Sequence, residues 1–138
     1  MVIKTQKSFL LAILLAVSPV AAATDLNPFL DYSGDQLFHR FCASCHGKFG
    51  YGDGPVATSI KVLIPDLTQL AKRAGGRFPV QRVREIIDGR ASLPAHGTRP
   101  MPVWGYELEA QVPEDQPSRA VAQGLIDRLV EYLSSIQR

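Results

Sequence analysis

This chain of 138 residues has few of the residue types that build most enzyme and metal sites. It contains two cysteines, two methionines, one tryptophan and three histidines, and one methionine is the first residue. The formal net charge is only +2, so the composition does not indicate a nucleic-acid partner. No repeat, low-complexity tract or alternating strand pattern is present, and no catalytic triad, paired carboxylates or phosphate-binding loop can be recognised. These absences favour a small all-α domain that is not an enzyme.

Long apolar runs are also scarce, and the main one lies at the N-terminus. Phe9 to Val17 is short for a membrane span of about 20 residues. Two lysines precede it, and Ala21 and Ala23 are spaced as in a signal-peptidase site. We therefore expect residues 1–23 to be a cleaved signal peptide, 24–32 a short leader and 33–138 the folded domain. This predicts a periplasmic protein without stable membrane insertion; an uncleaved anchor is the alternative.

Both cysteines lie in the pentapeptide Cys42-Ala-Ser-Cys45-His46. Thiols at this spacing reach the two vinyl groups along one porphyrin edge, and the histidine that follows places an imidazole under the iron. Two cysteines in an exported protein ordinarily form a disulfide, but these are too close in sequence for a stapling bridge. A thioredoxin-like dithiol would need a βαβ pattern, which is missing. The motif predicts one covalent haem c, attached at Cys42 and Cys45, with His46 as proximal iron ligand.

The second axial ligand largely decides whether such a haem carries electrons or binds small molecules. Met101 is the one methionine beyond the expected signal, and prolines on both sides stiffen its loop. Its soft sulfur favours ferrous iron, so we predict Met101 as the distal ligand. The alternative is a methionine that fills a gap in the core. His96, in the same loop, is a rival ligand, whereas His39 is expected at the surface.

Three further residues are candidates for the haem environment. The Pro65 carbonyl, or another backbone acceptor of its loop, could accept a hydrogen bond from the second ring nitrogen of His46. Trp104 could donate to a haem propionate, and Arg99 could pair with its charge. The alternatives are a simple turn at Pro65, packing for Trp104 and a solvated Arg99.

The remaining pattern predicts four or five short helices wrapped around the haem. A cap at Asp31 or Ser33 begins the first, and a cap at Ser118 begins the last. Residues 91–117 hold five prolines and are expected to be mostly loop, which a bound haem would order. The expected helix limits are 33–42, 65–74, 79–89 and 118–136. In the third of these, the residues expected to face inward are Val80, Val83, Ile86 and Ile87.

Charge is unevenly distributed along the chain. The segment from Lys61 to Arg99 holds eight bases and three acids, and that from Glu107 onward holds six acids and three bases. Such asymmetry can steer an acidic partner. A set of solvated helix faces is the alternative.

The expected domain resembles the class I c-type cytochromes from about residue 33 to 136. The resemblance implies a cytochrome c fold in which the last helix crosses the first, with Gly34 allowing Tyr132 to approach and to pack near Phe38. The chain departs from the family in a long loop between Trp104 and Ser118, an insertion that could lie beside the exposed haem edge. The segments that carry the resemblance are Gly34…Leu37-Phe38, the haem motif, Gly52-Asp53-Gly54-Pro55, Pro65-Asp66-Leu67-Thr68, Gly75-Gly76-x-Phe78-Pro79, Met101-Pro102-x-Trp104-Gly105 and Leu129…Tyr132-Leu133.

The resemblance implies a periplasmic monohaem carrier of single electrons. Its partners would be a donor and an acceptor protein, such as a dehydrogenase, a reductase or a terminal oxidase. One alternative is a cytochrome subunit bound permanently to an oxidoreductase, which the long loop after Met101 would suit. Another is a gas- or peroxide-binding haem protein with a labile Met101.

Overall fold

The computed structural model describes residues 28–90 and 101–138, so the expected signal peptide and the first part of the leader lie outside the described residues. In the described ranges all regular structure is helical, as the sequence predicts, with six α-helices and three short 3-10 helices. These are η1 (Pro28–Asp31), α1 (Gly34–Phe41), α2 (Ala43–His46), η2 (Ala57–Ser59), η3 (Leu67–Gln69), α3 (Leu70–Arg73), α4 (Val80–Asp88), α5 (Trp104–Glu109) and α6 (Ser118–Ser135).

Helix α1 begins at a capping box in which Ser33, one of the two expected cap residues, occupies the N-cap position. The Gln36 backbone N–H donates to Ser33 Oγ at 3.2 Å, and the Ser33 N–H donates to Gln36 Oε1 at 2.8 Å. The helix ends at Phe41, and α2 follows after the single residue Cys42. The haem motif therefore stands at the end of a helix whose start is well defined.

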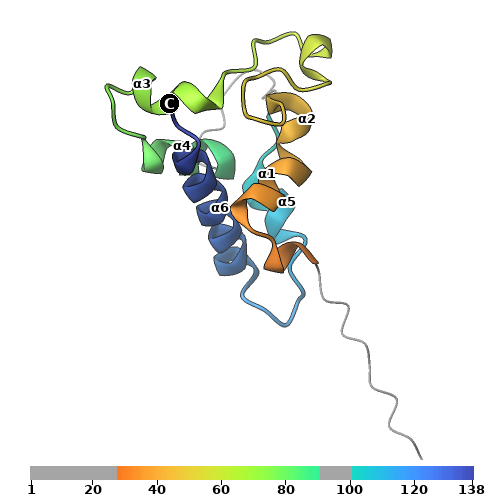
Figure 1. Cartoon of the computed structure of the whole chain (residues 1–138). Helices are drawn as coiled ribbons and strands as arrows, with labels where there is room; N and C mark the ends of the chain where they lie inside the picture. The colour runs from red at the N-terminus through yellow and green to blue at the C-terminus, as the bar shows by residue number, and fades with distance from the viewer. Residues whose placement is uncertain (1–27, 91–100) are drawn as a thin grey trace, which may run out of the picture.

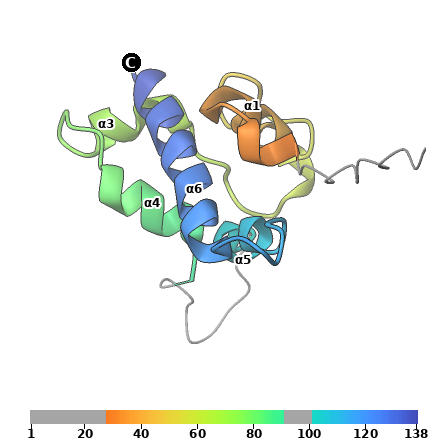
Figure 2. The ribbon, with the colours of Figure 1, turned by 90° about the horizontal axis from the view of Figure 1, so that it is seen from below.

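Helices α1 and α6 cross and form the centre of the core, as Figures 1 and 2 show. Leu37 and Phe38 of α1 are fully buried. A Cβ at Gly34 would collide with the Arg128 carbonyl and lie 2.8 Å from Tyr132 Cβ. The Phe38 and Tyr132 rings lie 5.2 Å apart between centroids. The close approach that the family resemblance implied at Gly34 is thus confirmed.

We expect Gly34→Ala to lower the free energy of unfolding by about 2 kcal/mol, because the added methyl group must push two helix backbones apart. Gly124→Ala is the matched control: Gly124 lies within α6 with nothing within 4 Å of its added Cβ. Alanine is the better helix former there, so the control should be about 1 kcal/mol more stable than wild type. Urea unfolding of the holoproteins measures both values, and a Gly34→Ala protein as stable as wild type would contradict the tight crossing.

Helix α4 buries a narrower face than its sequence predicts. Val83 and Ile87, one turn apart, are buried as expected. The prediction that Val80 faces inward is wrong, because this residue lies in the first turn and is 45% exposed. Ile86 is 39% exposed, yet it lines a cavity described below. Gly89 ends the helix in the left-handed conformation (φ 75°), as expected of a C-terminal stop.

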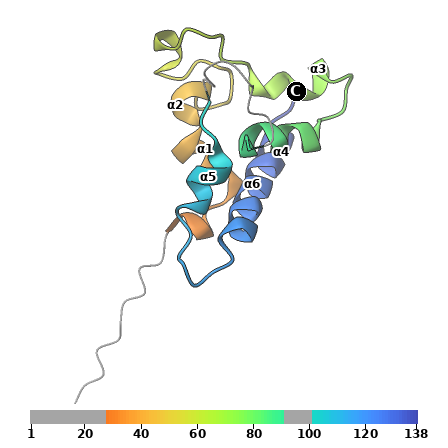
Figure 3. The same cartoon turned by 180° about the vertical axis from the view of Figure 1, so that it is seen from behind.

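The expectation that residues 91–117 are mostly loop is wrong for Trp104–Glu109, which forms α5. This helix packs against α4 and α6 and buries Leu108. The loop that connects α5 to α6 comprises residues 110–117. Figures 1 and 3 show that this loop lies at the end of α6 farthest from its C-terminus.

The cap expected at Ser118 is also wrong. Pro117 occupies the N-cap position of α6 and provides no side-chain cap. Ser118 is the first helical residue, and its hydroxyl is 3.5 Å from Glu109 Oε1. The serine therefore connects α6 to α5 instead of capping its own helix.

Candidate cofactor site

An apolar cavity opens between the end of α1, α2, α4, the segment before α5 and the C-terminal half of α6. It holds about 1050 Å³ of space not filled by protein atoms, its open mouth included. Leu129 and Leu133 of α6 form part of its wall, so the loop before α6 lies at the other end of the molecule. The insertion expected beside the haem edge therefore does not lie there. Apolar wall residues include Phe38, Phe41, Ile60, Val62, Leu63, Ile64, Leu67, Leu70, Val83, Ile86 and Ile87.

The haem motif forms one wall of this cavity. The His46 N–H donates to the Cys42 carbonyl at 2.9 Å, so the motif makes a helical turn. Residues three and four positions apart share a helix face, which brings Cys42, Cys45 and His46 to the same side. All three line the cavity, and neither cysteine is in a disulfide.

The thiol of Cys42 is poorly suited to redox exchange. Burial raises the pKa of Cys42 to about 12, with a smaller contribution from the neighbouring Cys45. Dithiol oxidoreductases need a thiolate, which a lowered pKa provides. The environment of Cys42 does the opposite, which argues against a thioredoxin-like function.

His46 is held as a neutral imidazole, the form that binds metals. Burial lowers its pKa, and the Pro65 carbonyl opposes this shift. Its Nδ1 atom is buried and makes no hydrogen bond of normal geometry. The Pro65 carbonyl is the acceptor on this side of the ring, and an Nδ1–H directed at it would orient Nε2 toward a metal in the cavity.

The glycine-rich segment after the motif supports it from behind. The Gly52 N–H donates to the His46 carbonyl at 2.8 Å, and the Gly54 N–H donates to the Cys45 carbonyl at 3.2 Å. A Cβ at Gly54 would collide with the Ser44 and Cys45 backbone. The turn-forming composition of this segment is evident in the sequence, but its role as a backbone cradle for the motif is not.

Met101 and Trp104 approach the cavity from the segment that leads into α5. Both are half-buried wall residues. The Trp104 ring lies 5.6 Å from that of Phe41, the last residue of α1. Met101 lines the same cavity as Cys42, and Pro65 lines it as well. The structure thus gathers six of the predicted site residues around one cavity: Cys42, Cys45, His46, Pro65, Met101 and Trp104.

The other predicted residues fall elsewhere. His39 is exposed on α1, with Nδ1 3.0 Å from the Asp35 carbonyl, and it does not line the cavity. The surface position expected for His39 is confirmed. His96, the rival ligand, and Arg99, the candidate propionate partner, lie outside the described residues.

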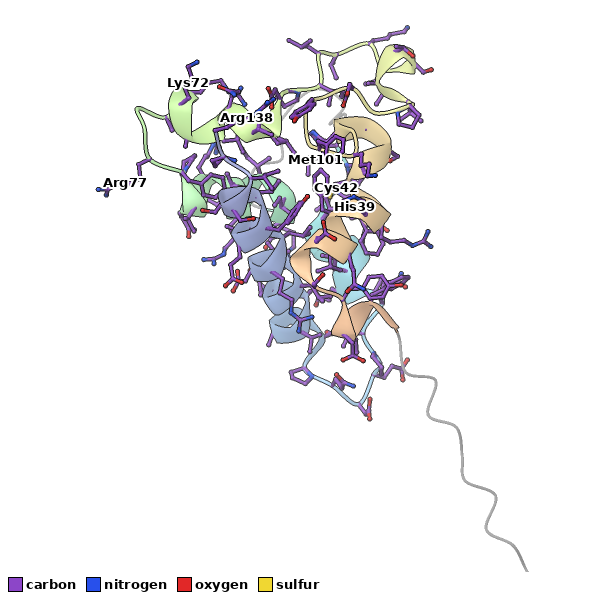
Figure 4. All side chains as sticks on the ribbon, viewed as in Figure 1. His39, Cys42, Lys72, Arg77, Met101 and Arg138 are labelled. Carbon is purple, nitrogen blue, oxygen red and sulfur yellow. The ribbon has the colours of Figure 1, made fainter. Side chains whose placement is uncertain are left out.

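The basic segment divides into paired and solvated residues. Arg84 pairs with Asp127 at 2.7 Å, and Arg90 is enclosed by two carboxylates. Lys61, Lys72 and Arg77 are exposed, and Figure 4 shows Lys72 and Arg77 directed outward around α3 and the turn after it.

The residues present fit a haem. The wall is apolar enough for a porphyrin, the paired thiols have the spacing for two thioethers, and an imidazole and a thioether sulfur are the axial donors of many haem carriers. Among the described residues no group of three or more His, Cys, Asp or Glu could hold a bare metal ion. In the same ranges no helix has the length and apolarity required to cross a membrane.

A family model described as Cytochrome c matches residues 33–137. No curated protein and no solved structure matches the chain.

Proposed function

Because this chain belongs to the cytochrome c family, we propose that it is a periplasmic carrier that transfers single electrons through a haem ligated by His46 and Met101. Members of the family are haem-binding electron carriers, with haem c attached covalently and redox proteins as partners. The observation that carries the proposed ligation is that His46 and Met101 line the same apolar cavity as both cysteines.

The chain's own residues have distinct proposed roles. When bound, the haem supplies an iron that changes between ferric and ferrous states. Cys42 and Cys45 would anchor it through thioethers, and His46 and Met101 would hold the iron from its two faces. The Pro65 carbonyl would accept from Nδ1 of His46 and fix its orientation. We further propose that Trp104 shields the haem beside Phe41 and that Arg99 pairs with a propionate.

A six-coordinate iron leaves no position for a substrate, which supports a carrier function over an enzymatic or gas-binding one. The subunit alternative drew on a long loop after Met101; α5 shortens that loop, and residues 110–117 remain outside any helix. Export to the periplasm is proposed from the N-terminal charge, apolar run and small residues alone.

Spectroscopy of the purified holoprotein tests this function. We expect a sharp α-band in the reduced state, a weak near-infrared sulfur-to-iron band in the ferric state, and little reaction of the reduced protein with carbon monoxide. A high-spin ferric spectrum with rapid carbon monoxide binding would instead show an open distal position and a gas-binding protein.

A second experiment tests whether the exposed bases guide a partner. Lys72→Gln/Arg77→Gln should slow electron transfer to an acidic redox protein by roughly threefold at low ionic strength, and much less at high salt. Arg40→Gln/Arg119→Gln removes two exposed bases from outside the basic segment and is the matched control. Stopped-flow rates at several salt concentrations decide the question. Equal rates for the two double variants would mean that Lys72 and Arg77 are only solvated.

A further inference from the structure

A partly buried ion cluster joins the end of α4 to α5. Arg90 Nε donates to Asp88 Oδ1 at 2.6 Å, and one terminal nitrogen donates to Asp88 Oδ2 at 3.1 Å. The other terminal nitrogen donates to Glu109 Oε2 at 2.5 Å. Only 12% of the Arg90 side chain is exposed. Because the planar guanidinium bridges one carboxylate of α4 and one of α5, it fixes both the distance between the two helices and their relative orientation.

Helix α6 completes the cluster. Gln123 Nε2 donates to Asp88 Oδ2 at 2.6 Å, and the Ser118 hydroxyl reaches Glu109. The guanidinium holds the pKa of Asp88 below its usual range, mainly through the hydrogen bond, so the carboxylate stays charged at neutral pH. The cluster is therefore a fixed junction of three helices.

The first turn of α5 rests directly on this junction. A Cβ at Gly105 would collide with Asp88 Oδ1 and would lie 2.7 Å from Arg90 Nε and 2.9 Å from the Asp88 carbonyl. Trp104, the residue before, lines the haem cavity, and Met101 precedes it by three positions. The lining of that cavity also includes Ile86 and Ile87, which immediately precede Asp88 in α4. The junction thus sets the distance between the segment that bears Met101 and α4.

We propose that Arg90, held between Asp88 and Glu109, is a positioning residue that keeps the Met101 sulfur on the haem iron and restricts access of other ligands to that face. This inference rests on the proposed ligation by His46 and Met101. Loss of the guanidinium leaves two carboxylates without their common partner, and α5 can then move away from α4. Met101 would spend more time off the iron, and an external ligand would bind more tightly in proportion to that open fraction.

Imidazole titration of the ferric holoprotein tests the inference. Arg90→Met should bind imidazole roughly tenfold more tightly than wild type, equivalent to about 1.4 kcal/mol. Its sulfur-to-iron band should also be weaker. Arg82→Met is the matched control: Arg82 lies in α4, the helix that ends just before Arg90, is 65% exposed and pairs with Glu85 at 3.9 Å. The control should titrate as wild type does.

A second variant changes the junction without removing a charge. Gly105→Ala places a methyl group against Asp88 and Arg90, so it should also raise the imidazole affinity. If Arg90→Met yields no holoprotein, Gly105→Ala and Arg90→Lys decide the question, since lysine keeps the charge but cannot bridge both carboxylates as the guanidinium does. If the Arg90 and Gly105 variants bind imidazole with the same affinity as Arg82→Met, this inference is wrong and the proposed function is unaffected. A wild-type ferric protein without the sulfur band overturns the proposed function instead.

Discussion

Replacing Met101 with alanine should abolish the near-infrared sulfur-to-iron band and lower the reduction potential by on the order of 0.2 V, within the roughly 0.8 V that axial ligands span. The thioether stabilises ferrous iron, so water or a nitrogen donor in its place favours the ferric state. The reduced variant should also bind carbon monoxide readily. Redox titration and absorption spectra measure these three changes.

Val103→Ala is the matched control for this experiment. Val103 lies in the same short segment before α5 and is half-buried, but it does not line the cavity. It should retain the sulfur band and a potential close to wild type. If Met101→Ala keeps an unchanged spectrum, Met101 is not a ligand, and His96 becomes the leading candidate for the distal face.

Replacing either motif cysteine with alanine should reduce the yield of normal holoprotein to near zero, because a single thioether is poorly handled by the attachment machinery. Ser44→Ala changes an exposed residue inside the same pentapeptide, so it should mature at the wild-type level. Haem-stained gels and pyridine haemochrome spectra measure the covalent yield. A wild-type yield of covalently bound haem from either cysteine variant would contradict attachment at both Cys42 and Cys45.

The sequence predicts the haem side of this molecule well because its signals are local. The cap at Ser33, the helical spacing of Leu37 and Phe38, and the five-residue motif lie within one stretch of chain. Gly89 likewise ends α4 through its own backbone conformation. Such features depend on neighbours in sequence, so pattern reasoning finds them before any tertiary contact is known.

The misses arise where tertiary packing decides. The prolines at 100, 102 and 113 favour a loop, yet no proline lies within Trp104–Glu109, and burial of Leu108 against α6 stabilises a helix there. The Arg90 junction was not predicted either, since Glu109 lies far from Arg90 in sequence. The one local indication of this junction is a basic residue directly after the glycine that ends α4, and this indication is weak.

The burial of Cys42 limits when the cofactor can be joined to the protein. Thioether formation requires an accessible and reactive sulfur, yet the closed fold raises the pKa of this thiol to about 12 and places it against the core. The core is closed by the packing of α6 against α1. In an unfolded polypeptide both sulfurs are exposed, whereas in the folded chain Cys42 is half-buried and its thiol is a weaker acid. We therefore expect attachment to be faster before α6 docks, and slowing that docking should increase the covalent haem yield measured on haem-stained gels.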